Sequence, residues 1–550
     1  MDSKKLRQEF LKFFEKKGHK IVPSSSLLPA DSSVLLTTAG MQQFKEYFLG
    51  KESPYGPRVA SCQKCFRTSD IDNVGDVSHL TFLEMLGHFS FGDYFKKETI
   101  EWTFEFLTKV LKISVDRITA TVFEGDEKIP FDEESYQTWL KFLPEKQIKK
   151  NPKKDNVWGP VGDEGPCGAA NEVYIDGLEV ATLVFVEYFC AKDGSLTPLA
   201  QKGVDVGWGL ERVGMIAQGK KSIFETDLFE PLMEALPDSL SERQKRIVSD
   251  HARGIVFLIS DGVRPFNKET GYVLRRLLRR MIVLIKDGTA LKKLFNLVVQ
   301  EYQDFYPDLD KNTANAVFDE ESRKFNQALD KGLAEFKKMG EIDAKEAFKL
   351  YESFGLPYEV IKEIGGLKAA ALTKEDFDKE LESHQEVSRA GAESKFGGGG
   401  KFSPRLHTAT HLLQAALREV LGSEVKQMGS DITSSRLRFD FSHPQKMSEM
   451  EIKKVEGLVN QKIQEDLEVK KTEMSYNEAI KQGALAFFKE KYPERVTVFS
   501  IDSFSKEICA GPHVKRTREL GCLKIIQEES SGAGVRRIKA IIYGQQEKDF

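Results

Sequence analysis

Four side chains with the chemistry of metal ligands recur in two short segments of the second half of the chain. His407 and His411 lie four residues apart in HTATHLL, and Cys509 and His513 lie four residues apart in EICAGPHV. On a helix this spacing places two side chains on one face. Imidazole nitrogens and a thiolate are preferred donors for Zn²⁺, which takes four of them in a tetrahedron. A pair of buried structural histidines is the alternative, but it does not explain the second segment.

A second set of residues could bind a nucleotide. Arg67 ends the run RVASCQKCFR, where a hairpin would present its guanidinium to phosphate oxygens. The segment DVGWGLERV brings Asp205, Gly207 and Arg212 to a place where a strand turns into a helix, and its glycines would let the backbone approach a small ligand closely. Each pattern alone is weak, because a hairpin arginine more often forms a surface ion pair.

Cys62 and Cys65 form a CxxC pair in the same region. A zinc site would need a second pair at suitable spacing, and the sequence has none, so these residues are predicted to be small packing groups. Six cysteines are few for 550 residues. This number favours a reducing compartment, the cytoplasm, and argues against a disulfide framework.

The bulk composition is that of a globular protein with several domains. A chain of 550 residues is too long for one hydrophobic core, so three or more domains are expected. The net charge of −4 gives no global sign of nucleic-acid binding. No run of 18 apolar residues indicates a membrane span, and MDSKKLRQEF is not a signal peptide.

The pattern of apolar residues predicts the elements that position these groups. Apolar residues at helical spacing predict a helix at 6–14, and long Glu-, Lys-, Leu- and Ala-rich stretches predict helices from about 240 to 390. The glycine-rich KFGGGGKFSP at 395–404 is predicted to be a flexible linker. Short apolar runs predict the strands of mixed or antiparallel sheets: VLLTTAG, TFLEMLGHFSFGDYF, ATLVFVEYF, RLRFDF, RVTVFSI and IKAIIYG.

One helix combines an apolar side with four arginines. Residues 241–290 contain 11 Lys or Arg and 5 Asp or Glu. In GYVLRRLLRRMIVLI, Arg275, Arg276, Arg279 and Arg280 share one flank, and leucines occupy the other. The helix is predicted to dock through its leucines and to offer its cationic side to phosphates, although a solvated charged face is the common alternative.

Long phrases of the sequence resemble the alanyl-tRNA synthetases, a family of class II aminoacyl-tRNA synthetases. VLLTTAGMQQFKEYFLG resembles motif 1 of that family, QKCFR with TFLEMLGHFSFGDYF resembles motif 2, and DVGWGLER resembles motif 3. DNVWGPVGDEGPCGAANEVYID is similar to its amino-acid pocket. HTATHLLQAALREVLG, QMGSDITSSRLRFDF and CAGPHVKRTRELG resemble its editing domain, which is related to a module of threonyl-tRNA synthetases.

The resemblance implies an α+β multidomain fold. It implies a class II catalytic domain built on an antiparallel sheet at 1–235, and a helical tRNA-recognition domain at 236–394. After the linker at 395–404, it implies an α+β, zinc-containing editing domain at 405–550.

The resemblance also implies an activity: alanine is activated by ATP with Mg²⁺ and passed to the 3′ end of tRNA(Ala). Arg67 would hold the α-phosphate, Phe82 and Arg212 would sandwich adenine, and Asp205 would pair with the ammonium of alanine. Gly207 and Trp158 would limit the size of the pocket. The remaining residues expected at the ATP and alanine site are Met41, His79 and Thr182.

Further residues are implied for tRNA and for editing. Asn267, the four arginines and Glu352 would contact the acceptor stem. His407, His411, Cys509 and His513 would bind Zn²⁺, with Thr408 and Gln427 as polar contacts to a mischarged ester. Editing is physically needed because a pocket for alanine cannot strongly reject glycine or serine, which differ from it by one small group.

Several positions depart from the family pattern. Ala181 and Thr182 stand where Trp-Asn is common, Trp208 stands where Met is usual, and the loop after Arg67 is short. Glu352 replaces an Asp and Pro512 replaces a Thr. None of these changes removes a charged catalytic group.

Three other classes of protein compete with this interpretation. A hydrolase that only edits, with the front half as a tRNA-binding scaffold, would draw support from Ala181 and Thr182, but Arg67, Asp205 and Arg212 argue against it. A non-catalytic RNA-binding paralogue would show damage in both sites, and a threonyl-tRNA synthetase would carry its editing module ahead of its core. Because the chain ends soon after the editing phrases, it is expected to be a short form without the family's C-terminal domain, and a monomer.

Overall fold

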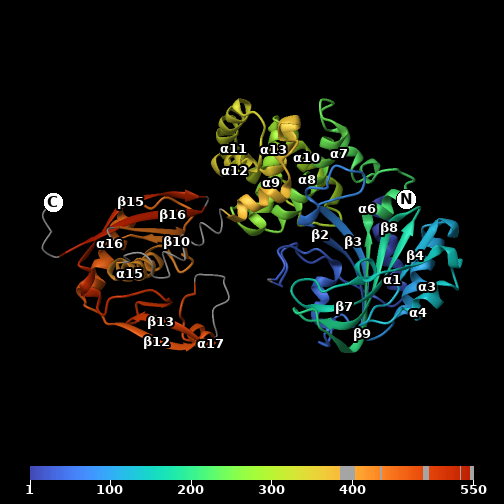
Figure 1. The fold of residues 1–550 in the computed structure, drawn as a ribbon, viewed down its shortest axis with the longest axis horizontal. Coiled ribbons are helices and arrows are strands. Elements are labelled where there is room, and N and C mark those ends of the chain that lie inside the picture. The colour runs from blue at the N-terminus through green and yellow to red at the C-terminus, as the bar shows by residue number, and fades with distance from the viewer. Residues whose placement is uncertain (32, 384–402, 434–435, 487–494, 533, 545–550) are drawn as a thin grey trace. The chain divides into compact units, whose positions relative to one another are not determined.

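The two largest groups of buried apolar side chains lie in two compact units of the chain, Met1–Phe377 (unit 1) and Asp378–Phe550 (unit 2). The structure is a computed structural model, and it describes all residues except 32, 384–402, 434–435, 487–494, 533 and 545–550 (Figure 1). Within the described residues, no helix is long and apolar enough to cross a membrane.

A nine-stranded sheet forms the framework of unit 1. Its order is β1-β2-β3-β9-β8-β7-β4-β5, with β6 paired to β7, and every pairing from β2 to β4 is antiparallel. The strands are β1 (Lys20–Ile21), β2 (Arg58–Phe66), β3 (Phe82–Phe91), β4 (Ile118–Phe123), β5 (Ile148–Asn151), β6 (Val157–Trp158), β7 (Gly165–Ile175), β8 (Leu178–Cys190) and β9 (Leu196–Gly209).

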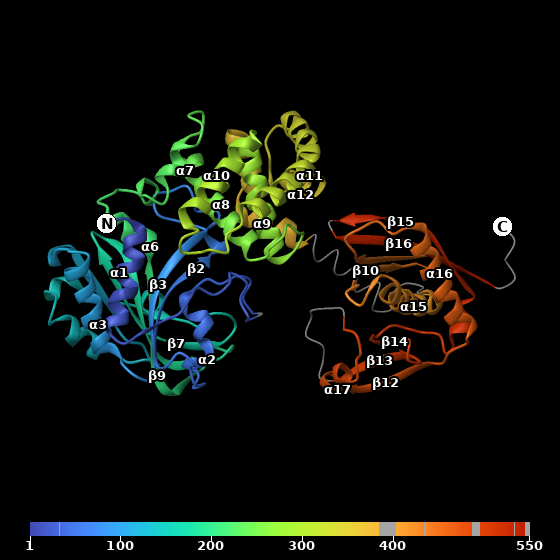
Figure 2. The same cartoon turned by 180° about the vertical axis from the view of Figure 1, so that it is seen from behind.

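One face of this sheet is covered by helices, among them α1 (Ser3–Lys16) and α6 (Leu210–Ala217) (Figure 2). Helix α1 begins at its N-cap Asp2, whose side chain accepts a hydrogen bond from Lys5 N. Phe10 and Phe14 of α1 are fully buried at helical spacing, as the sequence predicts. The other short helices near the sheet are α2 (Lys45–Phe48), α3 (Lys96–Glu105), α4 (Glu133–Trp139) and α5 (Lys153–Asn156).

The second half of unit 1 is helical, as predicted. Its helices are α7 (Glu230–Glu234), α8 (Glu242–Ser260), α9 (Glu269–Leu284), α10 (Gly288–Tyr302), α11 (Lys311–Lys338), α12 (Ala344–Phe354) and α13 (Tyr358–Gly365). Helix α8 packs on β3, where the ring of Phe257 stacks on that of Phe82 with centroids 4.1 Å apart. The helices and the sheet therefore share one continuous hydrophobic core. The expected domain boundary at 235/236 lies inside this unit and stays a prediction.

Unit 2 is an α+β unit with two sheets, of order β10-β11-β16-β15 and β12-β13-β14. Ser403 caps α15, Pro404 occupies its first position, and the helix ends at Gly422. The elements are α15 (Pro404–Leu421), β10 (Gln427–Ile432), β11 (Leu437–Ser442), α16 (Glu449–Gln464), β12 (Val469–Ser475), α17 (Tyr476–Lys481), β13 (Arg495–Ile501), β14 (Ser505–Ile508), β15 (Cys522–Gly532) and β16 (Val535–Tyr543).

The α+β organisation and five of the six predicted strands are confirmed, and one strand is wrong. VLLTTAG at 34–40 forms no strand; it leads irregularly into the short helix Gly40–Phe44. Its backbone forms scattered hydrogen bonds, such as Thr37 N to Leu27 O and Phe66 N to Thr37 O, instead of a ladder. Of the predicted linker, residues 395–402 lie outside the described residues, Ser403 is the N-cap of α15, and Pro404 is its first residue.

Candidate active site and metal centre

Along the central strands β8 and β9 of unit 1, successive side chains point alternately into the core and into a pocket. In the register of β8 and β9, Ala181 faces Trp208 and both are buried in the core, whereas Thr182 faces Gly207 and both line the pocket. The next pair on the pocket side brings Asp205 into the lining. The full lining is Ala39, Arg67, Asp70, Ser78, His79, Leu80, Leu83, Met85, Trp158, Glu179, Val180, Thr182, Val184, Asp205, Gly207, Gly209, Glu211 and Arg212.

Two buried acids line this pocket: Glu211 is paired with Arg253, and Asp205 lies on β9. The side chain of Asp205 is 5% exposed, and burial raises the pKa of its carboxyl to about 7. Loss of hydration disfavours the charged form, so a cationic group in the pocket would bring the carboxylate back to its ionised state. The position suits an anchor for an ammonium group.

Gly207 lets the side chain of Met85 pack closely against the backbone of β9, in the same cavity as Asp205. A Cβ at this position would lie 2.9 Å from Met85 Sδ, closer than real Cβ atoms approach a neighbour. Trp158 lines the same cavity from β6. The pocket is therefore narrow at the end where the acid lies.

Two arginines supply positive charge to the same cavity. Arg67 directly follows β2 and donates from Nε to Thr38 O at 3.4 Å. Arg212 lies in the first turn of α6, where Nη1 donates to Glu179 Oε2 at 3.0 Å. Thr182 Oγ1 also donates to Glu179, at 3.1 Å to Oε1. Glu179 thus orients two lining residues, and sequence reasoning missed it.

His79 lines the pocket from the loop that follows Arg67. Its Nδ1 contacts the carboxylate of Asp76, and the backbone N–H groups of Ser78 and His79 also donate to Asp76. These hydrogen bonds lower the pKa of Asp76, although burial opposes them. The carboxylate therefore holds the histidine ring in place.

Two residues predicted for the nucleotide site lie elsewhere. Phe82 is fully buried in the core against Phe257, on the opposite face of β3 from the pocket, and the next residue, Leu83, lines the cavity instead. Side chains along a strand alternate between its two faces, so a motif match that is off by one residue assigns the side chain to the wrong face. Met41 is 1% exposed and packs with Phe44 and Phe89 in the core.

The departures from the family pattern meet across the sheet. Ala181, where Trp is common, pairs directly with Trp208, where Met is usual. Trp208 is fully buried and makes edge contacts with Phe10 and Phe106 at centroid distances of 6.1 and 5.6 Å. A large side chain on one strand thus faces a small one on the next, which keeps the volume of the core.

Cys62 and Cys65 are packing residues, as predicted. They are 2% and 0% exposed on β2, and their separation of three residues directs them to opposite faces of the strand. A shared metal is therefore excluded by geometry.

The arginines of α9 do not form the free cationic face that was predicted. Leu274, Leu277 and Leu278 are buried as expected. The guanidiniums, however, are paired with carboxylates from other helices: Arg275 and Arg279 with Glu321, Arg276 with Glu359, and Arg280 with Glu363. A count of charges along the sequence overlooks these partners because they lie 42 to 83 residues away.

Two other residues predicted for tRNA contact lie on the surface. Asn267 is exposed and accepts a hydrogen bond from Arg275 Nη1. Glu352 is exposed on α12. Their contact with tRNA stays a prediction.

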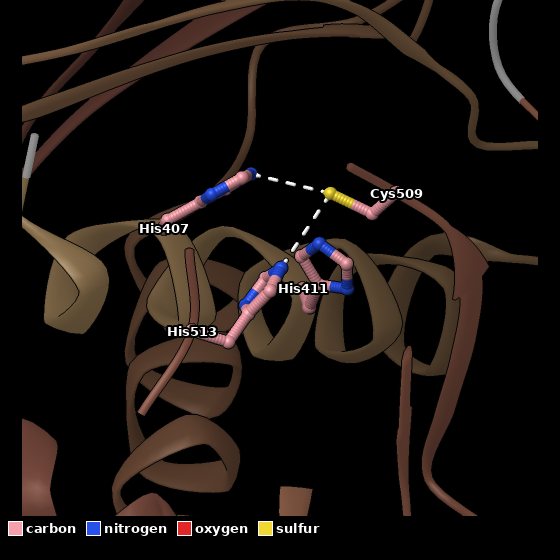
Figure 3. A group of neighbouring side chains, drawn as sticks. All are labelled: His407, His411, Cys509 and His513. Atoms are coloured by element: carbon pink, nitrogen blue, oxygen red, sulfur yellow. Dashed lines mark hydrogen bonds between the residues drawn. The ribbon is translucent and has the colours of Figure 1, made fainter. Parts of the chain in front are cut away.

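The four predicted metal ligands come together in unit 2 (Figure 3). His407 and His411 project from α15, and Cys509 and His513 follow β14. Their donor atoms all lie within 4.8 Å of one another, and Cys509 Sγ is 3.5 Å from both His407 Nε2 and His513 Nε2. Donors bound to a tetrahedral zinc ion lie about 3.3–3.8 Å apart, so the group fits such an ion after a small closure.

Two of the histidines hydrogen-bond through their other nitrogen: His407 Nδ1 is 3.2 Å from Pro512 O, and His513 Nδ1 is 3.1 Å from Thr408 Oγ1. His411 Nδ1 lies 3.3 Å from Glu507 Oε2 without forming a hydrogen bond. Such outer partners orient metal-binding imidazoles. Burial also lowers the pKa values of all three rings, to about 3 for His513, which favours the neutral form that binds a metal.

Gly511 allows the two ligand segments to approach. A Cβ here would lie 1.9 Å from His407 Cε1. Thr408 is fully buried, and its hydroxyl already contacts Pro404 O, His513 Nδ1 and Val514 N. In this arrangement Thr408 contacts His513, and its contact with a substrate stays a prediction.

Gln427 begins β10, and its Nε2 donates to Ser430 Oγ at 3.1 Å. Its role in editing stays a prediction. Among the residues that sequence reasoning missed, Glu507 could have been noticed as an acid two residues before Cys509 on a strand, but Glu179 carries no such signal.

Two family profiles and several known proteins match this chain. The profile of the class II tRNA synthetases (A) matches residues 5–452, and that of the threonyl and alanyl tRNA synthetase second additional domain matches residues 496–539. The alanine–tRNA ligase of Treponema pallidum (strain Nichols) is 43% identical over 99% of this chain and 98% of its own length. Those of Borrelia hermsii and Fervidobacterium nodosum are 41% and 36% identical over 98% of this chain, and over 99% and 80% of their own lengths.

Proposed function

This chain belongs to the alanine–tRNA ligases, a family of class II tRNA synthetases, and on that premise we propose that it activates alanine with ATP and transfers it to tRNA(Ala). The observation that carries this proposal is that Arg67, Asp205, Gly207 and Arg212, from separate segments, line one cavity. That cavity holds a buried acid, a glycine two residues away on the same strand, and two arginines.

In the first step, a carboxylate oxygen of alanine attacks the α-phosphorus of ATP. The bond to the bridging oxygen breaks, and pyrophosphate leaves with the electron pair. Negative charge grows on the phosphate oxygens, so preorganised guanidiniums stabilise the transition state. Arg67 and Arg212 supply them here, and Mg²⁺ accompanies the triphosphate. Glu179 holds Arg212 in place beforehand.

The alanine end of the pocket is assigned to Asp205 and Gly207. The carboxylate of Asp205 receives the ammonium group, and the missing side chain of Gly207 leaves room for a methyl. Met85 and Trp158 close the space around it. A larger side chain would collide with these walls, whereas glycine and serine would not be strongly rejected.

The adenine ring is assigned to the space between Leu83 and Arg212, in place of the predicted pair of Phe82 and Arg212. Leu83 offers an apolar contact from β3, and a guanidinium stacks well on a ring from the other side. In the second step, the terminal ribose hydroxyl of the tRNA attacks the acyl carbon, releasing AMP and a proton.

The tRNA is assigned to the helical half of unit 1, where Asn267 and Glu352 are exposed. Each of the four α9 arginines already faces a carboxylate, so these arginines offer less free positive charge to tRNA phosphates than the sequence suggested. The sparse cysteines, all six of which are unpaired, support action in the cytoplasm.

Unit 2 is proposed to hydrolyse mischarged Ser- or Gly-tRNA(Ala). His407, His411, Cys509 and His513 would hold Zn²⁺, which would orient or polarise the ester there. Water adds to the ester carbonyl, and the products are the free amino acid and the tRNA hydroxyl. Thr408 holds His513 and Pro512 O holds His407 in the orientation that this site needs.

Alanine-dependent exchange of pyrophosphate into ATP tests the ligase proposal. The wild-type chain is expected to show exchange with alanine, and Asp205→Asn is expected to lose it, since the isosteric amide cannot pair with the ammonium. Asp176→Asn, at an exposed ion pair with Arg117, is the matched control and retains exchange. Exchange that survives in Asp205→Asn would remove Asp205 from the alanine site.

Hydrolysis of Ser-tRNA(Ala) tests the editing proposal. Cys509→Ala is expected to lower both the bound zinc, measured by mass spectrometry, and the rate of deacylation, without changing alanine-dependent exchange. A full complement of zinc in the variant would contradict the assigned ligand set.

A further inference from the structure

The loop that carries pocket residues is fastened to the helices by arginines. Residues 68–81 connect β2 to β3, and Asp70, Ser78, His79 and Leu80 of this loop line the ATP and alanine cavity. Arginines of α8 and α9 hold the other side of the loop, and two of these were predicted to bind tRNA.

Helix α9 makes two of these contacts. Arg276 Nη2 donates to Asp72 Oδ1 at 2.7 Å, while its Nε donates to Glu359 Oε2 at 2.8 Å. Arg280 Nη1 donates to Ile71 O at 3.1 Å, and the same side chain pairs with Glu363. Each guanidinium therefore bridges the loop and α13.

Helix α8 makes the remaining contacts. Arg246 Nη1 lies 3.3 Å from Asp76 O and 3.5 Å from Gly75 O. Gly75, with φ +120°, leaves no room for a Cβ beside Arg243 Cγ at 2.8 Å. At the end of the loop, Asp250 accepts hydrogen bonds from the backbone and the hydroxyl of Thr81.

The bridging arginines are buried enough for these contacts to matter. The side chains of Arg276 and Arg280 are 14% and 2% exposed. A guanidinium fork that is held by a carboxylate on one side presents fixed donors on the other. Between its anchored residues, the loop positions Asp70 and His79 toward the cavity.

We propose that Arg276 and Arg280 are positioning residues for the nucleotide site, which set the conformation of loop 68–81 and thereby the affinity for ATP. Both arginines also bind α13, which contacts α12, the helix that carries exposed Glu352. Displacement of the helices by a bound tRNA would therefore be transmitted to the nucleotide pocket. The expected effect on ATP affinity rests on the proposed ligase function. The attachment of the loop to the helices does not depend on that function.

The decisive variant is Asp72→Asn, because it weakens the contact from the loop side and leaves Arg276 paired with Glu359. The KM for ATP in alanine-dependent exchange is expected to rise roughly five-fold, with the KM for alanine changed by less than about two-fold. Arg276→Gln is expected to give a similar rise, and the double variant no more than the larger single effect. Arg276→Lys is expected to recover only part of the affinity, since it cannot bridge two carboxylates with a fork.

The control is Asp319→Asn, which removes an ion pair of the helices, with Lys292 at 3.1 Å, that does not involve the loop. It is expected to leave both KM values unchanged. The exchange reaction contains no tRNA, so an effect there cannot come from a lost tRNA contact.

Amide hydrogen exchange of the ligand-free protein provides a second readout. Asp72→Asn is expected to speed exchange at residues 70–78 and leave β3 unchanged. Equal protection in the variant and the wild type, or a KM for ATP that rises no more in Asp72→Asn than in Asp319→Asn, would overturn the proposal. If the wild type shows no alanine-dependent exchange, the ligase proposal fails, and hydrogen exchange still decides whether the arginines hold the loop.

Discussion

At the residue scale, the proposed role of Asp205 as the ammonium partner predicts that alanine binding is sensitive to pH. Burial raises the pKa of its carboxyl to about 7 in the ligand-free pocket, so the group is neutral below that pH and ionised above it. Alanine needs the ionised form. We expect kcat/KM for alanine in exchange to fall about ten-fold for each pH unit below 7 and to be level above it. A profile that is flat from pH 5.5 to 8 would show that this carboxyl is already ionised.

Gly207 is a second residue whose size matters. In Gly207→Ala, the new Cβ would lie 2.9 Å from Met85 Sδ and fill the space assigned to the methyl of alanine. The KM for alanine is expected to rise at least about ten-fold, while the KM for ATP changes little. Gly340→Ala is the matched control, because no atom lies within 4 Å of a Cβ there. Equal effects of both substitutions on alanine would rule out this role.

At the element scale, two departures from the family pattern lie at facing positions of strands β8 and β9, where one compensates for the other. Ala181 and Trp208 are direct cross-strand partners in the core. Ala181→Trp is expected to destabilise unit 1 by about 1–3 kcal/mol through overpacking, and Trp208→Met by about 2 kcal/mol through a cavity. The double variant is expected to cost at least about 1 kcal/mol less than the sum. Urea unfolding measured by circular dichroism checks this, and strict additivity would mean that the two sites do not share space.

The geometry of helices, loops and strands also explains which site residues could be predicted from the sequence. The metal ligands were found because each pair is local, at a spacing that one helix or one loop maintains. The acid and glycine of motif 3 were found for the same reason. Phe82 lies in the core and Leu83 lines the pocket, because successive side chains of a strand point to opposite faces and only the register with β9 shows which face lines the pocket.

At the scale of the whole molecule, two separate cores predict two separable unfolding transitions. All four tryptophans, Trp102, Trp139, Trp158 and Trp208, lie in unit 1, whereas the metal ligands lie in unit 2. Removal of metal by a chelator is expected to lower the melting temperature of unit 2 by on the order of 10 °C, since a bound ion stabilises only the folded unit. The melting curve from tryptophan fluorescence is expected to stay in place.

Differential scanning calorimetry with and without chelator, beside tryptophan fluorescence, separates the two units. His411→Ala should reproduce the shift of the second transition without chelator. A chelator that moves the fluorescence transition equally would indicate that the two units unfold as one.

The sequence by itself determined the chemistry of both sites: a His₃Cys ligand set, an acid beside a glycine, and two arginines, each readable from local spacing or from a long family resemblance. The tertiary structure alone decided what each charged or apolar group faces. It placed Leu83 rather than Phe82 in the pocket and paired the α9 arginines with distant carboxylates. The physical reason is that chain neighbours set covalent spacing, whereas burial and charge pairing depend on residues that only folding brings together.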